Sequence, residues 1–283
     1  MIHLRRTDYK TIAFLHLPKT GGMTLIKHLQ THLFKVPLMD VPNSEALLDA
    51  PDVIRGAELV AGHYFYPLLN MLDQPAFTMT LLRDPVQRTI SSYQFVLRHP
   101  THPLYEKFVA ARISSPIEFA TDEYFAFHGS NMQTRMLGVD YDFSSLIHGI
   151  KTKAISIDEA KAEVGSAENR PCDAAGLQRA MRRLKSMGFF GLTEHYQASI
   201  KLLCRTFNLE VPSAAYMENA APGEDLARRA LVNPGEMEAL RDSNHFDEEL
   251  YRFAMDLFYE RCQMHGIAVS RVDPAEAKVR LRA

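Results

Sequence analysis

Residues 17–22 read Leu-Pro-Lys-Thr-Gly-Gly, a combination of residue types suited to binding an anion. The segment, called the lysine loop here, follows an apolar run and precedes helix-forming residues, so it predicts a turn between a buried strand and a helix. Free backbone N–H groups and the positive end of the helix dipole meet at such a turn. The glycines permit close approach of the backbone, and Lys19 adds a full positive charge. This chemistry fits a phosphate or a sulfate.

The order of residues separates the lysine loop from the loop of ATP-binding enzymes, in which a lysine follows the last glycine. Here Lys19 precedes Gly21, and no glycine stands upstream of it in the loop. The alternative interpretation is an ordinary strand-turn-helix junction with a solvated lysine.

A second group begins at Arg83, directly after the apolar run Phe77–Leu82. An arginine guanidinium binds phosphate through two parallel hydrogen bonds, and Ser91 lies two turns into the helix that should follow. Asp84 is suited to cap this helix, with the proline after it at the first helical position. Arg88 either contacts the same ligand or pairs with a surface carboxylate. The alternative is that the group only starts a helix.

A histidine is the usual general base near neutral pH. His63 directly follows the predicted strand Glu58–Gly62, and parallel strands open their ligand sites at this end. The alternative is a histidine satisfied by a backbone carbonyl. His16, at the end of the first strand, is the rival base. His99 and His102 either line an acceptor site or lie in a loop.

Together these segments resemble carbohydrate sulfotransferases that use 3′-phosphoadenosine 5′-phosphosulfate (PAPS), by pattern the heparan sulfate 2-O-sulfotransferase-like enzymes and their bacterial relatives. The resemblance implies in-line transfer of a sulfuryl group to a hydroxyl of a glycan or another acceptor, leaving adenosine 3′,5′-bisphosphate and needing no metal. It implies His63 as the general base and Lys19 as the residue that stabilises the leaving oxygen. The cofactor contacts that it implies are Pro18, Lys19, Thr20, Gly21, Gly22, Met23, Thr24, Arg83 and Ser91.

Two positions depart from the family pattern. Met23 stands where the family often has a small hydroxyl residue, and Ala61 stands where a second histidine can occur. Weaker resemblance at 131–137, 191–194 and 244–251 is mostly structural in character.

Alternating strands and helices predict an α/β, P-loop-like three-layer fold with a central parallel sheet flanked by helices. The expected strands are Thr11–His16, Glu58–Gly62, Phe77–Leu82 and Gly188–Leu192. The expected helices include Thr24–Phe34, Val86–Arg98, Ala174–Ser186 and Glu194–Phe207, the last capped by Thr193. Residues 37–51 predict a loop with one short helix, and 104–137 predict helices interrupted near residue 128. We expect one domain over 1–283, with an insertion or mobile region at 139–173.

The net charge of −2 over 283 residues gives no global basic field, so nucleic acid is not an expected partner. Three scattered cysteines form neither a disulfide framework nor a metal motif. With no apolar run of about 20 residues and no signal-like start, we expect a cytoplasmic, bacterial protein without a membrane span. The acceptor, most simply a saccharide, and the oligomeric state stay open.

A basic cluster on the helix at 174–186 either binds a sulfated or uronate glycan or forms a solvated face. Its members are Arg179, Arg182, Arg183 and Lys185. Two other functions compete with sulfuryl transfer. One is a P-loop nucleotide kinase or phosphotransferase, which would need Mg²⁺, and the other is a non-catalytic nucleotide-binding protein.

Overall fold

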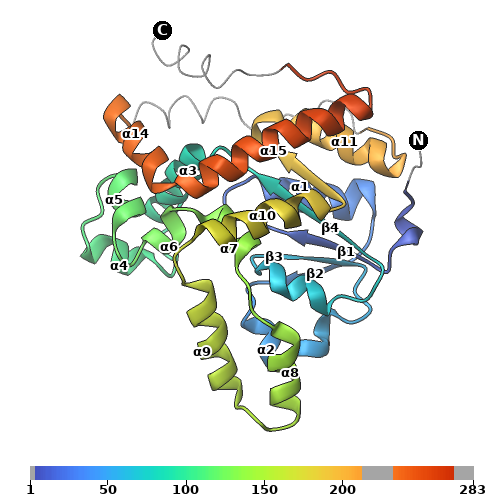
Figure 1. Cartoon of the computed structure of the whole chain (residues 1–283), viewed down its shortest axis with the longest axis horizontal. Coiled ribbons are helices and arrows are strands. Elements are labelled where there is room, and N and C mark those ends of the chain that lie inside the picture. Colours follow the sequence, from blue (N-terminus) through green and yellow to red (C-terminus); the bar gives the residue numbers. More distant parts are fainter. Residues whose placement is uncertain (1–3, 212–231, 271–283) are drawn as a thin grey trace.

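The computed structural model describes residues 4–211 and 232–270, which form a five-stranded sheet flanked by helices (Figure 1). The strands are β1 (Thr11–Leu15), β2 (Leu38–Val41), β3 (Leu59–Gly62), β4 (Ala76–Leu82) and β5 (Phe189–Leu192). Their order is β2-β3-β1-β4-β5, and every neighbouring pair is parallel. The predicted α/β class with a central parallel sheet is confirmed.

The register aligns the carboxyl ends of the strands. Leu15 pairs with Gly62 on one side and with Thr80 on the other, and Leu82 pairs with Leu192. The segments that follow β1, β3, β4 and β5 therefore leave from one edge of the sheet. This edge carries the lysine loop and the residues directly after the other three strands.

Most helices along the first half of the chain are short, and α3, with 14 residues, is the exception. They are α1 (Gly22–His28), α2 (Ala46–Asp49), α3 (Pro85–Arg98), α4 (Tyr105–Ala110), α5 (Pro116–Thr121), α6 (Ala126–Gly129) and α7 (Met132–Gly138). The later helices are α8 (Phe143–Lys151), α9 (Ile157–Glu168), α10 (Ala174–Ser186), α11 (Tyr196–Phe207), α14 (Pro234–Ser243) and α15 (His245–Met264). Figure 1 shows α10, α11 and α15 together above the sheet, whereas α8 and α9 extend below the body of the molecule.

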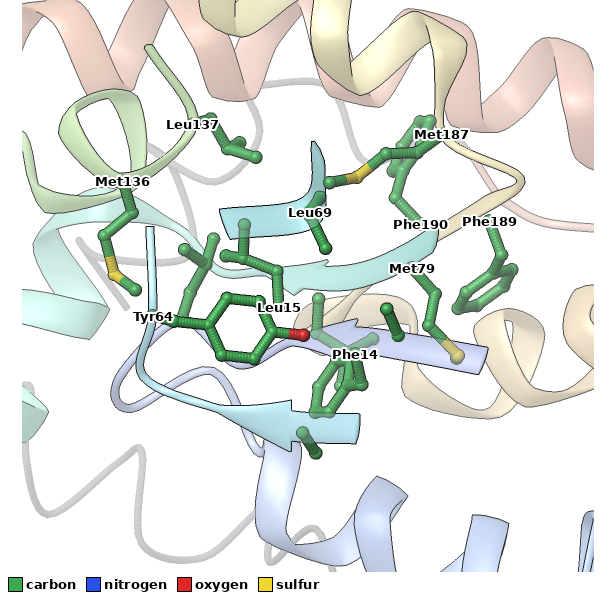
Figure 2. Close-up of a cluster of buried hydrophobic side chains, with 14 of the residues drawn as sticks. Phe14, Leu15, Tyr64, Leu69, Met79, Met136, Leu137, Met187, Phe189 and Phe190 are labelled. Carbon is green, nitrogen blue, oxygen red and sulfur yellow. The ribbon is translucent and has the colours of Figure 1, made fainter. Parts of the chain in front are cut away.

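The core lies between the sheet and these helices. All five residues of β1 are buried, as are all four of β5, which explains why both read as continuous rather than alternating apolar runs. In Figure 2 the ring of Tyr64 lies beside Leu15 among side chains from the strands and from α7. Burying such rings and aliphatic chains supplies the main favourable free energy of folding.

Two elements differ from the expectations. Strand β2 lies inside the segment expected to be a loop, although the short helix expected there is present as α2. A four-residue edge strand between Pro37 and Pro42 carries too little alternation to be distinguished from a loop. The first helix is α1 followed by a π-helical turn over Leu29–Leu33 rather than one regular helix.

The basic cluster on α10 is not a uniformly solvated face. Arg179 donates from Nε to the carbonyl of Gly138 at 2.8 Å, and Arg183 donates to the carbonyl of Leu137 at 2.9 Å. Both arginines therefore satisfy carbonyls at the C-terminal end of α7, where a cation is favoured. Of the four basic residues, Arg182 and Lys185 are exposed.

Candidate functional site

The lysine loop has a backbone that only some residues tolerate. Gly21 has φ +82° and Lys19 has φ +68°, so the chain twice enters the left-handed region within three residues. The hydroxyl of Thr20 donates to the carbonyl of Leu17 at 2.8 Å and closes the turn. A side chain at Gly22 would collide with the ring of His16, so this glycine is required by packing.

The lysine loop is bound to the ends of two neighbouring strands. The Thr193 hydroxyl lies 2.6 Å from the carbonyl oxygen of Thr20 and 2.9 Å from that of Leu82. The predicted helix-capping role of Thr193 is wrong, because its hydroxyl serves these carbonyls and α11 begins later, at Tyr196. The loop is thus held in place before any ligand arrives.

Arg83 extends from the end of β4 toward the lysine loop, and its Nη1 donates to the carbonyl of Lys19 at 3.1 Å. Its backbone is held by Gln133, whose side chain accepts from the Arg83 N–H at 2.9 Å and donates to the Arg83 carbonyl at 2.8 Å. Asp84 caps α3 by accepting from the N–H of Gln87, as predicted. Ser91 is buried on the same helix. Arg83 and the lysine loop are therefore joined and form one side of the same site.

Behind Gln133, a network joins α7 to α15. Both oxygens of the Asp247 carboxylate accept backbone N–H groups of α7, from Gln133 at 3.1 Å and from Thr134 at 2.7 Å. In return, Asn131 accepts the N–H of Asp247 at 3.1 Å. Two of the segments that resembled the family only weakly, 131–137 and 244–251, are thus structural, since they fix the helix that holds Arg83.

His63 leaves β3 at the same edge. Its Nδ1 lies 2.7 Å from the carbonyl oxygen of His16, and the two rings lie in contact, tilted by 35° with centroids 4.4 Å apart. A carbonyl only accepts, so Nδ1 carries the proton, and in the neutral ring Nε2 keeps a lone pair. The side chain is exposed, so Nε2 is able to take a proton from a bound molecule. The predicted alternatives, a general base and a carbonyl-bound histidine, are therefore compatible.

His16 is unsuited to the same task. Burial, with smaller contributions from His63 and Lys19, lowers its pKa to about 3. Its imidazole is therefore neutral at physiological pH and is a weak base. Both histidines were expected at strand ends on one sheet edge, but the direct contact between their rings was not predicted.

The ammonium group of Lys19 lies 3.8 Å from the ring centroid of Phe95 on α3. Phe95 also packs against His99, with ring centroids 4.1 Å apart, and against His102 at 5.5 Å. Burial lowers the pKa of His102, with additional effects of His99 and Lys19. The two histidines considered for an acceptor site therefore lie next to Lys19. The aromatic platform beneath Lys19 was not anticipated from the sequence.

Arg88 is placed neither to contact the ligand nor to pair with a surface carboxylate. It is too buried for a surface ion pair, and its guanidinium is used in hydrogen bonds within the protein. It is fully buried and donates to the carbonyls of His128 at 3.1 Å and Gly129 at 2.9 Å. Met23, in the first turn of α1, is 70% exposed. The remaining predicted contacts, Pro18, Thr24 and the backbone of the loop, lie around the same turn.

The part of the chain that the structure describes contains no cluster of three or more histidine, cysteine, aspartate or glutamate side chains able to hold a metal ion. None of its helices combines the length and apolar character of a membrane span.

No family model matches the chain. Among curated proteins it is similar to human heparan-sulfate 6-O-sulfotransferase 3, with 28% identity over 65% of this chain and 38% of that protein. It is also similar to Chinese hamster heparan-sulfate 6-O-sulfotransferase 1, with 27% identity over 89% of this chain and 68% of the relative. Zebrafish heparan-sulfate 6-O-sulfotransferase 1-B gives 27% identity over 92% of this chain. The chain spans about two fifths of the length of the first relatives it matches.

These similarities support a carbohydrate sulfotransferase family for this chain. The relatives carry the 6-O designation, so the finer resemblance to 2-O-sulfotransferases is not confirmed. The expected localisation in a bacterial cytoplasm is wrong, because the matching relatives are enzymes of animals.

Proposed function

We propose that this chain transfers a sulfuryl group from PAPS to a hydroxyl group of a saccharide. One observation carries the proposal: the lysine loop, Arg83 and His63 lie at one sheet edge and are joined through the carbonyls of Lys19 and His16. A loop with one lysine and free backbone N–H groups, together with an arginine, suits a nucleotide with phosphate at both ends, and a histidine suits a hydroxyl acceptor. The similarity to heparan-sulfate sulfotransferases points to the same chemistry.

In this proposal the 5′-phosphosulfate binds to backbone N–H groups of the lysine loop, Thr20 included, and to the hydroxyl of Thr24 on α1, whereas the Thr20 hydroxyl donates to the Leu17 carbonyl and shapes the turn. Arg83 and Ser91 bind the 3′-phosphate. Arg83 also holds the Lys19 carbonyl, so the two halves of the nucleotide site are set relative to each other. Preorganised donors of this kind act without reorganisation when charge develops.

His63 then takes the proton of the acceptor hydroxyl on Nε2, while the His16 carbonyl stabilises the proton on Nδ1. A bond forms between the acceptor oxygen and sulfur as the bond from sulfur to the bridging phosphate oxygen breaks. The electron pair goes to that oxygen, and adenosine 3′,5′-bisphosphate leaves. Lys19, moved from the face of Phe95, stabilises the negative charge that develops there.

We also infer a P-loop-like arrangement, because the loop follows the central strand β1 and the strand order places β3 and β4 on either side of it. We propose that residues 1–283 form one sulfotransferase domain, with α8 and α9 as its insertion.

Thermal unfolding tests the cofactor. At about 100-fold above its dissociation constant, a ligand stabilises the folded state by about 2.7 kcal/mol. We expect this stabilisation from adenosine 3′,5′-bisphosphate and a far smaller one from ATP with Mg²⁺. Lys19→Met should weaken the effect, whereas Lys27→Met, an exposed lysine on α1, should leave it unchanged. Equal shifts from both nucleotides would favour a phosphotransferase and refute the assignment.

Transfer itself is tested with sulfur-labelled PAPS and a panel of acceptors. We expect label in desulfated heparan sulfate and none in small alcohols. If only the small alcohols are labelled, the saccharide acceptor is wrong although the cofactor is right.

A further inference from the structure

A cavity of about 120 Å³ lies between α7, the end of α9 and the start of α10. None of the cofactor-binding residues proposed above lines it, and it has an arginine-rich wall. Its polar lining consists of Thr134, Arg135, Arg170, Cys172 and Arg179, with Asp140 and Asp173 at the side. The cavity is called the α7 pocket below.

The two carboxylates of the α7 pocket already have partners. Asp140 forms an ion pair with Arg183 at 3.0 Å, and Asp173 caps α10 by accepting the N–H of Gly176 at 2.6 Å. Of the arginines, Arg179 donates one hydrogen bond, from Nε to the carbonyl of Gly138. Arg170 is exposed at the rim. With Asp140 paired to Arg183, the lining still holds Arg135, Arg170 and Arg179 against the one carboxylate of Asp173, so its net charge is positive.

The floor of the α7 pocket holds polar groups that the protein does not satisfy. Thr134 is fully buried and its hydroxyl has no hydrogen-bond partner in the structure. Arg135 is 8% exposed, and its Nε also lacks a partner, although its Nη1 donates to the carbonyl of Phe127. Buried donors of this kind are costly unless something binds them. Both are donors, as an anion requires.

We propose that the α7 pocket binds an oxyanion group, a sulfate or a carboxylate, through Thr134 and Arg135 at its floor and Arg170 at its rim. Closely packed glycines form its wall: a side chain at Gly138 would collide with the carbonyl of Gly176. The cavity has the volume of a few water molecules, which suits one such group and not a nucleotide. The group is either a free anion or one carried by a saccharide, and only the second source rests on the proposed function.

Sodium sulfate titrated into the full ¹⁵N-labelled chain, against sodium chloride at equal ionic strength, tests the site. The readout is the amide resonances of Gly138 and Gly176, which line the α7 pocket and do not report on the lysine loop. We expect both to shift with a millimolar dissociation constant, about −4 kcal/mol in binding free energy. Absence of a shift up to about ten times that concentration overturns the proposal.

Three variants give the matched comparison. Thr134→Val removes a hydroxyl with no protein partner at nearly constant volume, so the fold should persist while the dissociation constant rises. Arg170→Gln should raise it about fivefold or more, the loss expected for one charge-assisted hydrogen bond. Arg182→Gln, an exposed arginine of α10 outside the pocket, should leave it unchanged. Equal dissociation constants in all three variants also overturn the proposal.

A sulfated uronate-glucosamine disaccharide, added in place of sulfate, distinguishes the sources. A tighter dissociation constant at the same two amides assigns the α7 pocket to a saccharide-borne anion, and an equal or weaker one assigns it to a free anion. Lys19→Met serves as the remaining control. It should weaken nucleotide binding without altering these titrations, so failure of the proposed cofactor is seen separately from failure of the pocket.

Discussion

His16 makes the folded state sensitive to acid. Its ring is buried at the end of β1, against His63 and beneath Gly22, and its pKa is about 3. An unfolded histidine has a pKa of about 6.5. Replacing His16 by glutamine keeps a polar side chain of similar length and removes the titration. The informative quantity is the change in unfolding free energy with pH, and not its value at one pH.

The lowered pKa determines the sign of the effect. Between the two pKa values the unfolded chain binds a proton that the folded chain does not, so stability falls as the pH falls below about 6.5 and is fully present above it. At about pH 5 the unfolded histidine is almost wholly protonated, whereas buried His16 is neutral. The free energy of unfolding at about pH 5 is therefore lower than at about pH 7.5 by about 2 kcal/mol.

Urea unfolding at the two pH values measures this loss. The wild-type chain should lose about 2 kcal/mol more than His16→Gln between about pH 7.5 and 5. His148→Gln, which removes an exposed histidine of α8, should lose as much as the wild type. If His16→Gln and the wild type lose equal amounts, the buried neutral imidazole is not the cause of the acid sensitivity.

Three further variants test the site. His63→Ala should lower turnover at least about 100-fold and leave adenosine 3′,5′-bisphosphate binding intact in a thermal shift, and preserved turnover would place the base elsewhere. Arg83→Lys should weaken that binding about tenfold by calorimetry, because an ammonium cannot reproduce the two-pronged contact, and an unchanged affinity would remove the arginine from the nucleotide site. Gln133→Leu leaves the buried N–H and carbonyl of Arg83 without their partners, so urea unfolding should show a loss of about 2–5 kcal/mol in stability, and a loss below about 1 kcal/mol would contradict the role given to Gln133.

The sequence was sufficient for the local part of the site. The lysine loop, Arg83 and His63 each directly follow a buried strand, and parallel strands bring such positions to one edge. The position of each residue directly after a strand thus predicted its place at this edge of the sheet. The predicted cap at Asp84 was correct for the same reason, since its partner is three residues away.

The rest depends on contacts between distant segments. Gln133 lies 50 residues from Arg83, and Asp247 lies 114 residues from Gln133. Their roles follow from how α7 packs, which no periodicity within either segment encodes. Thr193 has the type of a helix cap, yet its hydroxyl contacts the carbonyls of Thr20 in the lysine loop and of Leu82 in β4. Tertiary contacts decided both cases.

The link between α7 and α15 has a consequence for the growing chain during synthesis. Every motif that suggests nucleotide binding lies before residue 100, but the carboxylate that fixes α7, and through Gln133 the backbone of Arg83, belongs to Asp247. A nascent chain that has not yet reached α15 carries the lysine loop and the arginine but lacks the carboxylate that fixes α7 and, through Gln133, the backbone of Arg83. Cofactor binding is therefore expected to strengthen once translation has passed Asp247.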